Sequence, residues 1–159
     1  MRRVRFLIIE ALYESETSDH SAEAVFNRRL SEVADEDPEV GAPGPSGYGR
    51  GMLRAVLRRK EELDRYIHES ATQYPVETLA VVDRNILRLA ICELLSTGSA
   101  PAGAVVNEAV ELAHRYGGDS SPAFINGVLR TLSIRIRPEA SAEKPLEAVD
   151  SQNPKQQET

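Results

Sequence analysis

Apolar side chains recur at intervals of three and four residues along most of this 159-residue chain, and they do not alternate with polar ones. An α-helix turns once about every 3.6 residues, so this spacing is typical of helices that bury one face. It predicts an all-α fold with helices over about 3–16, 21–34, 48–72, 80–97, 102–116 and 122–136, and a short turn at 76–79.

Residues with strong positional preferences mark several helix ends. Ser21 and Ser121 are predicted N-caps, and Pro122 suits a first helical turn, where the N–H that proline lacks would have no partner. Gly98 and Gly117 suit the ends of the helices that precede them.

Proline and glycine concentrate in residues 35–49, DEDPEVGAPGPSGYG, which hold three of the nine prolines and four of the ten glycines. This composition predicts a loop that divides the helices into two blocks. Residues 139–159 carry five acidic and two lysine side chains, with too few large apolar side chains to offset the entropy lost on ordering. We therefore expect a helical domain over 1–137, with the 35–49 loop inside it, and an acidic disordered tail over 138–159.

Composition excludes several classes of protein. Cys92 is the single cysteine, which rules out an intramolecular disulfide and a cysteine-rich zinc module. Its place in an apolar run predicts a buried thiol in a reducing, cytoplasmic compartment. No apolar stretch approaches the ~20 residues that span a bilayer, and the N-terminus lacks a signal-peptide pattern, so we expect no membrane segment. A formal net charge of −6 argues against sequence-blind nucleic-acid binding but leaves room for a local basic patch.

Catalytic and metal-binding motifs are missing from the sequence. His20, His68 and His114 are scattered, and neither an HExxH helix nor a Cys/His cluster occurs. The glycine-rich run lacks the GK[ST] ending of a phosphate-binding loop, and no GxSxG turn is present. We therefore expect a protein that is not an enzyme and that uses no metal or other cofactor.

The first predicted helix has two unlike faces. One face is an ordinary core stripe, formed by Val4, Leu7, Ile8, Ala11 and Leu12. The opposite face begins with arginines and continues with Phe6, Ile9 and Tyr13, so either a second group of helices or a partner covers it.

Three arginines, Arg2, Arg3 and Arg5, lie at the start of this helix, where cations oppose the helix dipole. Burial does not account for them, and they have no local anions in the sequence. Their placement indicates an anionic ligand, with solvated surface charge as the alternative.

Three further positions indicate contacts with other groups. Asp83 falls among apolar residues in a first helical turn, where it either balances the helix dipole or accepts a hydrogen bond from a partner. Phe124 follows GGDSSP, whose hydroxyls and free helical N–H groups suit RNA, although a peripheral core phenylalanine behind a capped helix gives the same pattern. Gly127 costs about 1 kcal/mol relative to alanine in mid-helix, which indicates close approach by another helix or a ligand. We expect Glu93 to pair with a basic side chain.

Several strings of residues resemble the NusB family in order and spacing over about residues 2–136. They are RRVR and ALY in the first helix, VDRNILRLA and EL in the fourth, and then VNEAVELA and FINGVL. The last two strings are the most specific.

This resemblance implies an all-helical NusB-like fold of two packed helical bundles, with about seven helices in total, and a non-catalytic role in transcription antitermination. NusB-like proteins pair with NusE, a small-subunit ribosomal protein, and the pair binds the boxA element of ribosomal RNA leader transcripts. The complex joins the RNA polymerase elongation complex with other Nus factors and suppresses premature termination in rRNA operons. Because a basic partner would supply further cations, we expect weak RNA binding by the chain alone and tighter binding by the heterodimer.

Carried over residue by residue, the resemblance assigns two sets of side chains. The set facing NusE is Tyr13 and Asp83, and the RNA-binding set is Arg2, Arg3, Arg5, Ser120, Ser121, Phe124, Asn126 and Gly127. Two positions depart from the family pattern, because Ala123 stands where the family commonly has lysine and Arg130 where it commonly has aspartate.

Two alternative functions stay open at this point. One is a helical protein-interaction module, able to form a homodimer, that no longer binds RNA, and Ala123 and the acidic tail favour it. The other is a stand-alone relative of the N-terminal domain of rRNA cytosine methyltransferases, where a NusB-like module helps to recognise the substrate.

Overall fold

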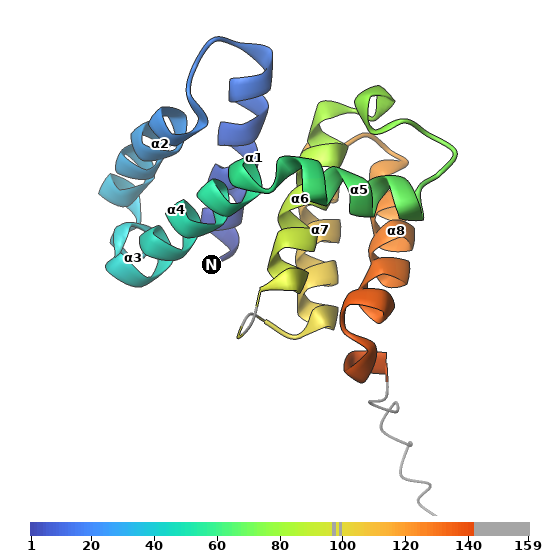
Figure 1. Ribbon diagram of the computed structural model, residues 1–159. Helices are drawn as coiled ribbons and strands as arrows, with labels where there is room; N and C mark the ends of the chain where they lie inside the picture. Colours follow the sequence, from blue (N-terminus) through green and yellow to red (C-terminus); the bar gives the residue numbers. More distant parts are fainter. Residues whose placement is uncertain (97, 99, 142–159) are drawn as a thin grey trace, which may run out of the picture.

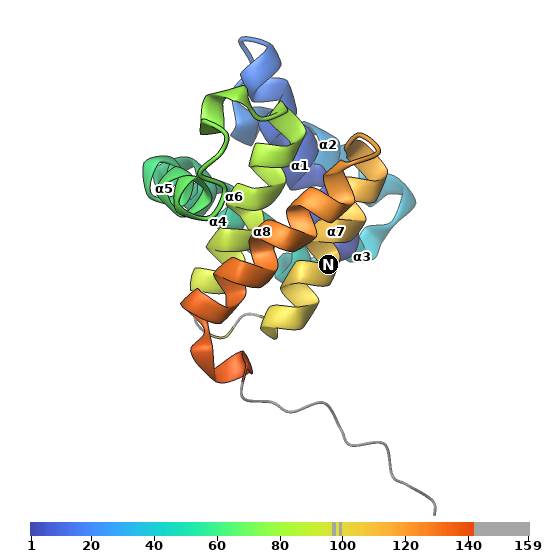
Figure 2. The ribbon, with the colours of Figure 1, turned by 90° about the vertical axis from the view of Figure 1, so that its right-hand side faces the viewer.

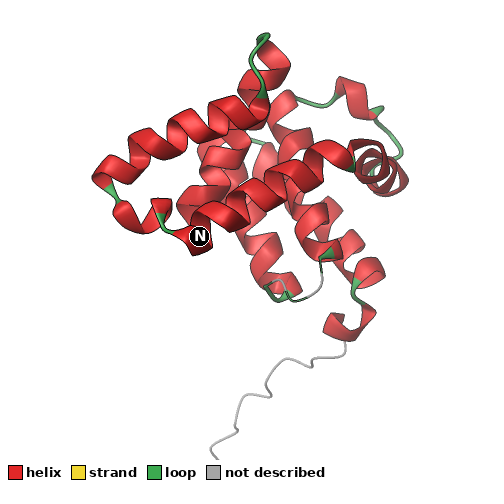
Figure 3. Ribbon diagram, turned by 60° about the vertical axis from the view of Figure 1, so that its left-hand side comes forward, coloured by secondary structure: helices red, strands yellow, loops and turns green. Residues whose placement is uncertain are grey.

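The computed structural model describes residues 1–96, 98 and 100–141. Within these residues the chain forms helices and short 3-10 turns, and no strand (Figure 3). The helices are α1 (Arg2–Thr17), α2 (Ala22–Glu36), α3 (Pro38–Gly41), α4 (Pro43–Arg58), α5 (Lys60–Ser70), α6 (Val81–Leu95), α7 (Ala102–Tyr116) and α8 (Ser121–Ile136), and the turns are η1 (Val76–Thr78) and η2 (Pro138–Ser141). The predicted all-α fold is confirmed.

The helices form two packed groups (Figure 1). Helices α1 to α4 pack against one another on one side, and α5 to α8 pack against one another on the other. Helix α6 joins the groups, because it contacts α1 and α4 as well as α5, α7 and α8. The expected arrangement of two packed bundles is therefore also confirmed.

Helix α6 is covered on nearly all sides, which explains its almost continuous run of apolar residues. The Cys92 thiol is fully buried, as expected, and this burial raises its pKa. Arg88 of the same helix is charged yet only 4% exposed. Helices α1 and α5 cover this face, and there Arg88 meets Glu16 and Asp64 at 2.8 and 2.7 Å.

Helix α1 is buried on both of its faces. The predicted core stripe of Val4, Leu7, Ile8, Ala11 and Leu12 is buried. On the opposite face Ile9 is buried as well, and Phe6 packs edge-on against Tyr116 of α7 with the ring centroids 5.9 Å apart. A second group of helices therefore covers most of this arc, while Tyr13 stays 46% exposed.

The 35–49 segment is helical, so the predicted Pro/Gly-rich loop is wrong. Pro38 and Pro43 occupy the first positions of α3 and α4, where a missing N–H costs nothing. A Cβ on Gly49 would lie 2.6 Å from both Val4 Cγ1 and Phe26 Cζ, so this glycine lets α4 approach α1 and α2 closely. Glycine here serves helix packing rather than loop flexibility.

Two other boundaries differ from the prediction. The helix expected over 48–72 is divided at Arg59, whose φ and ψ of −102° and 14° turn the chain between α4 and α5. Residues 138–141 form η2, while 142–159, with most of the predicted disordered tail, lie outside the described residues, as does residue 97. None of the helices in the described part of the chain is long and apolar enough to cross a membrane.

Candidate functional site

All three N-terminal arginines have carboxylate partners, which come from distant parts of the chain. Arg2 donates two hydrogen bonds to Glu108 of α7, at 2.9 and 3.1 Å, and Arg3 pairs with Asp37 at 3.0 Å. Their side chains are 57% and 47% exposed, which keeps both at the surface. Figure 2 shows the start of α1 beside α7, which is why Arg2 reaches a residue 106 positions away.

Arg5 differs from its neighbours because it is buried, which corrects its assignment to an exposed phosphate contact. Its Nε lies 2.8 Å from Glu93 Oε1, and the Tyr48 hydroxyl donates to the same oxygen at 2.7 Å. Burial lowers the pKa of Arg5, but the Glu93 carboxylate more than compensates and holds it above its ordinary value. The predicted basic partner of Glu93 is thus Arg5, and the cluster ties α1, α4 and α6 together.

The exposed pair at the start of α1 is dominated by its hydrogen bond rather than by burial. The hydrogen bond to Glu108 raises the pKa of Arg2, and the same bond lowers the pKa of Glu108. Both groups are therefore charged at neutral pH. An external anion at Arg2 would have to compete with Glu108.

The turn before α8 places one of its two serines outside and the other inside. Ser120 is exposed and is the N-cap residue, without a side-chain capping bond. Ser121 is buried, and its hydroxyl accepts a hydrogen bond from the Gly118 N–H at 3.0 Å, so its predicted N-cap role is wrong. A Cβ on Gly117 would lie 2.5 Å from Ser121 Cβ, so the tight turn requires this glycine.

The first turns of α8 carry the remaining residues of the predicted RNA-binding set. Phe124 is half-buried and, with Gly127, lines a groove of about 390 Å³ whose other wall is the 70–74 segment. Asn126 Oδ1 accepts a hydrogen bond from Arg130 Nε at 3.2 Å. A Cβ on Gly127 would meet nothing within 4 Å, so packing against another helix does not explain this glycine. Approach by a ligand remains the other explanation.

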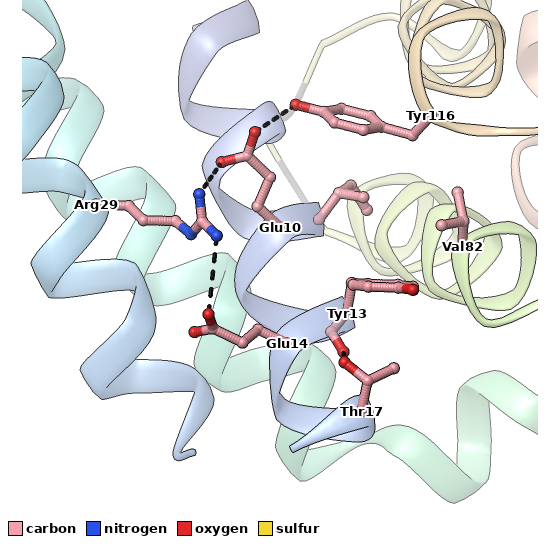
Figure 4. A pocket seen from close by; sticks show the side chains of 8 residues that line it. Glu10, Tyr13, Glu14, Thr17, Arg29, Val82 and Tyr116 are labelled. Carbon is pink, nitrogen blue, oxygen red and sulfur yellow. Dashed lines mark hydrogen bonds and ion pairs between the residues drawn. The ribbon is translucent and has the colours of Figure 1, made fainter. Parts of the chain in front are cut away.

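A second pocket, of about 480 Å³, opens between the two helical groups beside Tyr13 (Figure 4). Glu10 accepts hydrogen bonds from the Tyr116 hydroxyl at 2.7 Å and from Arg29 at 3.2 Å. Burial and the bond to Glu10 raise the pKa of Tyr116 to about 12. The remaining lining residues are Ile9, Glu14, Thr17 and Val82.

Asp83 follows Val82 in the first turn of α6, next to this pocket. Its Oδ1 is buried and has no hydrogen-bond partner among the described residues, and the same is true of Arg29 Nε. Buried polar atoms are normally paired, so both atoms are exceptions; Arg29 lines the pocket, and Asp83 follows a residue that does. The structure thus brings Tyr13 and the helix turn of Asp83 together although they are distant in sequence.

Sequence patterns did not reveal Glu10, Arg29 and Tyr116 as pocket residues. Each looks like an ordinary polar residue on an amphipathic helix, and only the packing of α1, α2 and α7 gathers them (Figure 4). Within the described ranges, no three His, Cys, Asp or Glu side chains are placed to hold a metal ion.

Comparisons with known proteins point in one direction. The sequence model of the NusB family matches residues 2–133. The transcription antitermination protein NusB of Dehalococcoides mccartyi (strain CBDB1) is 40% identical over 132 residues, covering 83% of this chain and 88% of that protein. The protein of the same name from Roseiflexus sp. (strain RS-1) is 39% identical over 138 residues, covering 86% and 93%.

Solved structures agree with this match. T. maritima NusB superposes with a TM-score of 0.76 at 28% identity, covering 88% of this chain and 95% of that one. A chain from the crystal structure of antitermination factors NusB and NusE in complex with dsRNA superposes with a TM-score of 0.69 at 25% identity, covering 84% and 96%.

Proposed function

The chain belongs to the NusB family, a family of transcription antitermination factors rather than enzymes, and we propose that it binds the boxA element of ribosomal RNA leader transcripts together with NusE. The observation that carries this proposal is its likeness, over 84% of its length, to a chain solved together with NusE and dsRNA. The heterodimer would join the RNA polymerase elongation complex with other Nus factors and suppress premature termination in rRNA operons.

The proposed RNA surface runs from the start of α1 to the start of α8. Arg2 and Arg3 are its exposed cations. At the start of α8 it includes the Ser120 hydroxyl, the Phe124 ring and the Asn126 amide, and Gly127 leaves room for RNA to approach the backbone. Arg5 and Ser121, both buried, support this surface from beneath rather than contact RNA.

The proposed NusE surface is the pocket beside Tyr13. Tyr13 is exposed, and one oxygen of the Asp83 carboxylate has no hydrogen-bond partner among the described residues. The pocket wall carries two carboxylates, Glu10 and Glu14, against one arginine, Arg29, with which both pair. An acidic, partly apolar pocket is complementary to a basic protein segment.

Fluorescence anisotropy with a labelled boxA RNA tests this function. The measurement uses low and moderate salt, with and without NusE from the same organism. We expect weak binding by the chain alone and tighter, boxA-selective binding with NusE. Arg2→Gln/Arg3→Gln and Phe124→Ala should weaken RNA binding, Tyr13→Ala should weaken NusE binding, and Arg50→Gln on α4 should change neither. Equal affinity for boxA and a scrambled RNA in the presence of NusE would refute the proposal.

A second candidate function is a protein-interaction module without RNA binding, which can form a homodimer. The observation that favours it is the carboxylate partner found for each of Arg2, Arg3 and Arg5. It predicts NusE binding of normal strength with no boxA preference, so the same titration separates the two functions.

A further inference from the structure

Arg115, near the end of α7, is an exposed arginine that lies over aromatic rings, with Glu111 one helical turn before it. Its Cζ lies 4.4 Å from the centroid of the Phe6 ring and 5.5 Å from that of Tyr116. No carboxylate lies within ion-pair distance of it among the described residues, whereas Arg2 and Arg3 nearby on α1 are both paired. Arg115 therefore presents a net positive charge that is already held in place.

The position of Arg115 connects the two parts of the proposed RNA surface. Helix α7 carries Glu108, the partner of Arg2, and about two turns later it carries Arg115. Phe6, on which Arg115 rests, lies one helical turn after Arg2 on α1. The chain then passes directly from the end of α7 into the turn that holds Ser120 and starts α8.

We propose that Arg115, positioned by the Phe6 ring, is a phosphate-binding residue that joins the N-terminal arginines to the start of α8 in one continuous RNA track. This inference rests on the proposed RNA-binding function. The ring attracts the guanidinium by a cation–π interaction and limits its rotamers, while the planar guanidinium can still donate hydrogen bonds from its edge to a phosphate. A guanidinium fixed beforehand loses less entropy when it binds.

Charge complementarity favours RNA over a protein partner at Arg115. The partner proposed for the Tyr13 pocket is basic, and a basic segment would be repelled by an unpaired arginine, whereas the RNA backbone carries one negative charge per nucleotide. Arg115 also supplies a cation on the surface where Ala123 replaces the lysine that is common in the family.

The test measures the affinity of the complex with NusE for boxA RNA by fluorescence anisotropy at several salt concentrations between about 50 and 200 mM. We expect Arg115→Gln to weaken binding about fivefold at low salt, as for one exposed charge contact, and to make the slope of log affinity against log salt shallower by about 0.7. Arg115→Lys should restore the slope. Phe6→Leu should weaken binding by about twofold with the slope unchanged, because the charge stays but its support is lost.

Arg58→Gln is the matched control, since Arg58 is an exposed arginine of α4 for which no carboxylate partner is present in the described part of the chain. It should leave affinity and slope unchanged, and thermal melting checks that each variant is folded. If Arg115→Gln binds RNA like the wild type while Arg2→Gln/Arg3→Gln loses affinity, the inference is wrong and the proposed function stands. If Arg115→Gln weakens NusE binding instead, Arg115 belongs to the protein interface and the inference is wrong. If the wild-type complex shows no boxA preference, the proposed function fails and the inference fails with it.

Discussion

The buried ion pair between Arg5 and Glu93 makes Arg5→Met a sharp test of whether this arginine is structural. Methionine fills a similar volume without charge, so the substitution leaves the Glu93 carboxylate, only 2% exposed, without its guanidinium partner. Removing one partner of a buried ion pair costs about 3–5 kcal/mol. Tyr48 still donates to Glu93 at 2.7 Å, which places the expected loss at the lower end, about 3 kcal/mol.

Chemical denaturation with urea, followed by circular dichroism, measures this loss. The free energy of unfolding should fall by about 3 kcal/mol, and the melting temperature by about 9 °C for a domain of this size. Arg5→Met/Glu93→Gln removes both charges and should recover most of the stability. The control is Arg54→Met, which breaks an exposed pair with Glu23 and should change stability by less than about 1 kcal/mol.

Two results would refute this reasoning. One is a stability of Arg5→Met within about 1 kcal/mol of the wild type, since a buried carboxylate cannot lose its main partner at so small a cost. The other is a shallower salt dependence of RNA binding in the folded Arg5→Met protein, because a guanidinium enclosed by α1, α4 and α6 makes no contact with phosphate.

Three further substitutions test the electrostatics and packing of the two surfaces. Glu108→Gln frees Arg2, so the complex with NusE should bind boxA RNA more tightly, measured by anisotropy; unchanged affinity would place Arg2 outside the RNA surface. Gly127→Ala should raise the free energy of unfolding by about 0.5–1 kcal/mol, because a Cβ there meets nothing, yet weaken RNA binding if RNA approaches that backbone. Because the pKa of Tyr116 is raised to about 12 in the folded protein, its protonated hydroxyl stabilises the fold fully below pH 10, and this stabilisation is lost as the pH rises towards 12. Tyr116→Phe should therefore make the free energy of unfolding, measured by urea denaturation, fall less steeply with pH over that range.

Apolar periodicity predicted the buried faces well, because which face a helix buries is a local property of its sequence. The stripe from Val4 to Leu12 is buried as predicted, and so is the single thiol of Cys92. The prediction of a loop at residues 35–49 was wrong, because prolines at the first position of a helix and a glycine at a helix crossing give the segment the composition of a loop. The difference between these uses depends on neighbours that only the fold supplies.

The candidate site was harder to predict because each of its arginines pairs with a carboxylate from a distant part of the chain. The partners of Arg3, Arg5 and Arg2 lie 34, 88 and 106 positions away along the chain, so no local pattern shows them. Of the two proposed surfaces, the one around Tyr13 is better reflected in the sequence. An aromatic residue following a buried stripe and a carboxylate among apolar residues both stand out there, and the structure places their helix turns side by side.

If RNA binds the proposed surface, we expect its phosphates to replace carboxylates, because Arg2 and Arg3 are already paired. A phosphate at Arg2 displaces Glu108 and a phosphate at Arg3 displaces Asp37, so the gain at each is the difference between two charge contacts. Arg115, without a carboxylate partner in the described residues, gains the whole contact. We therefore expect a chain of net charge −6 built in this way to hold RNA weakly by itself and to avoid indiscriminate binding. Tight RNA binding would then require a second, basic subunit in the same complex, because two linked binding sites give a much higher affinity than either site alone.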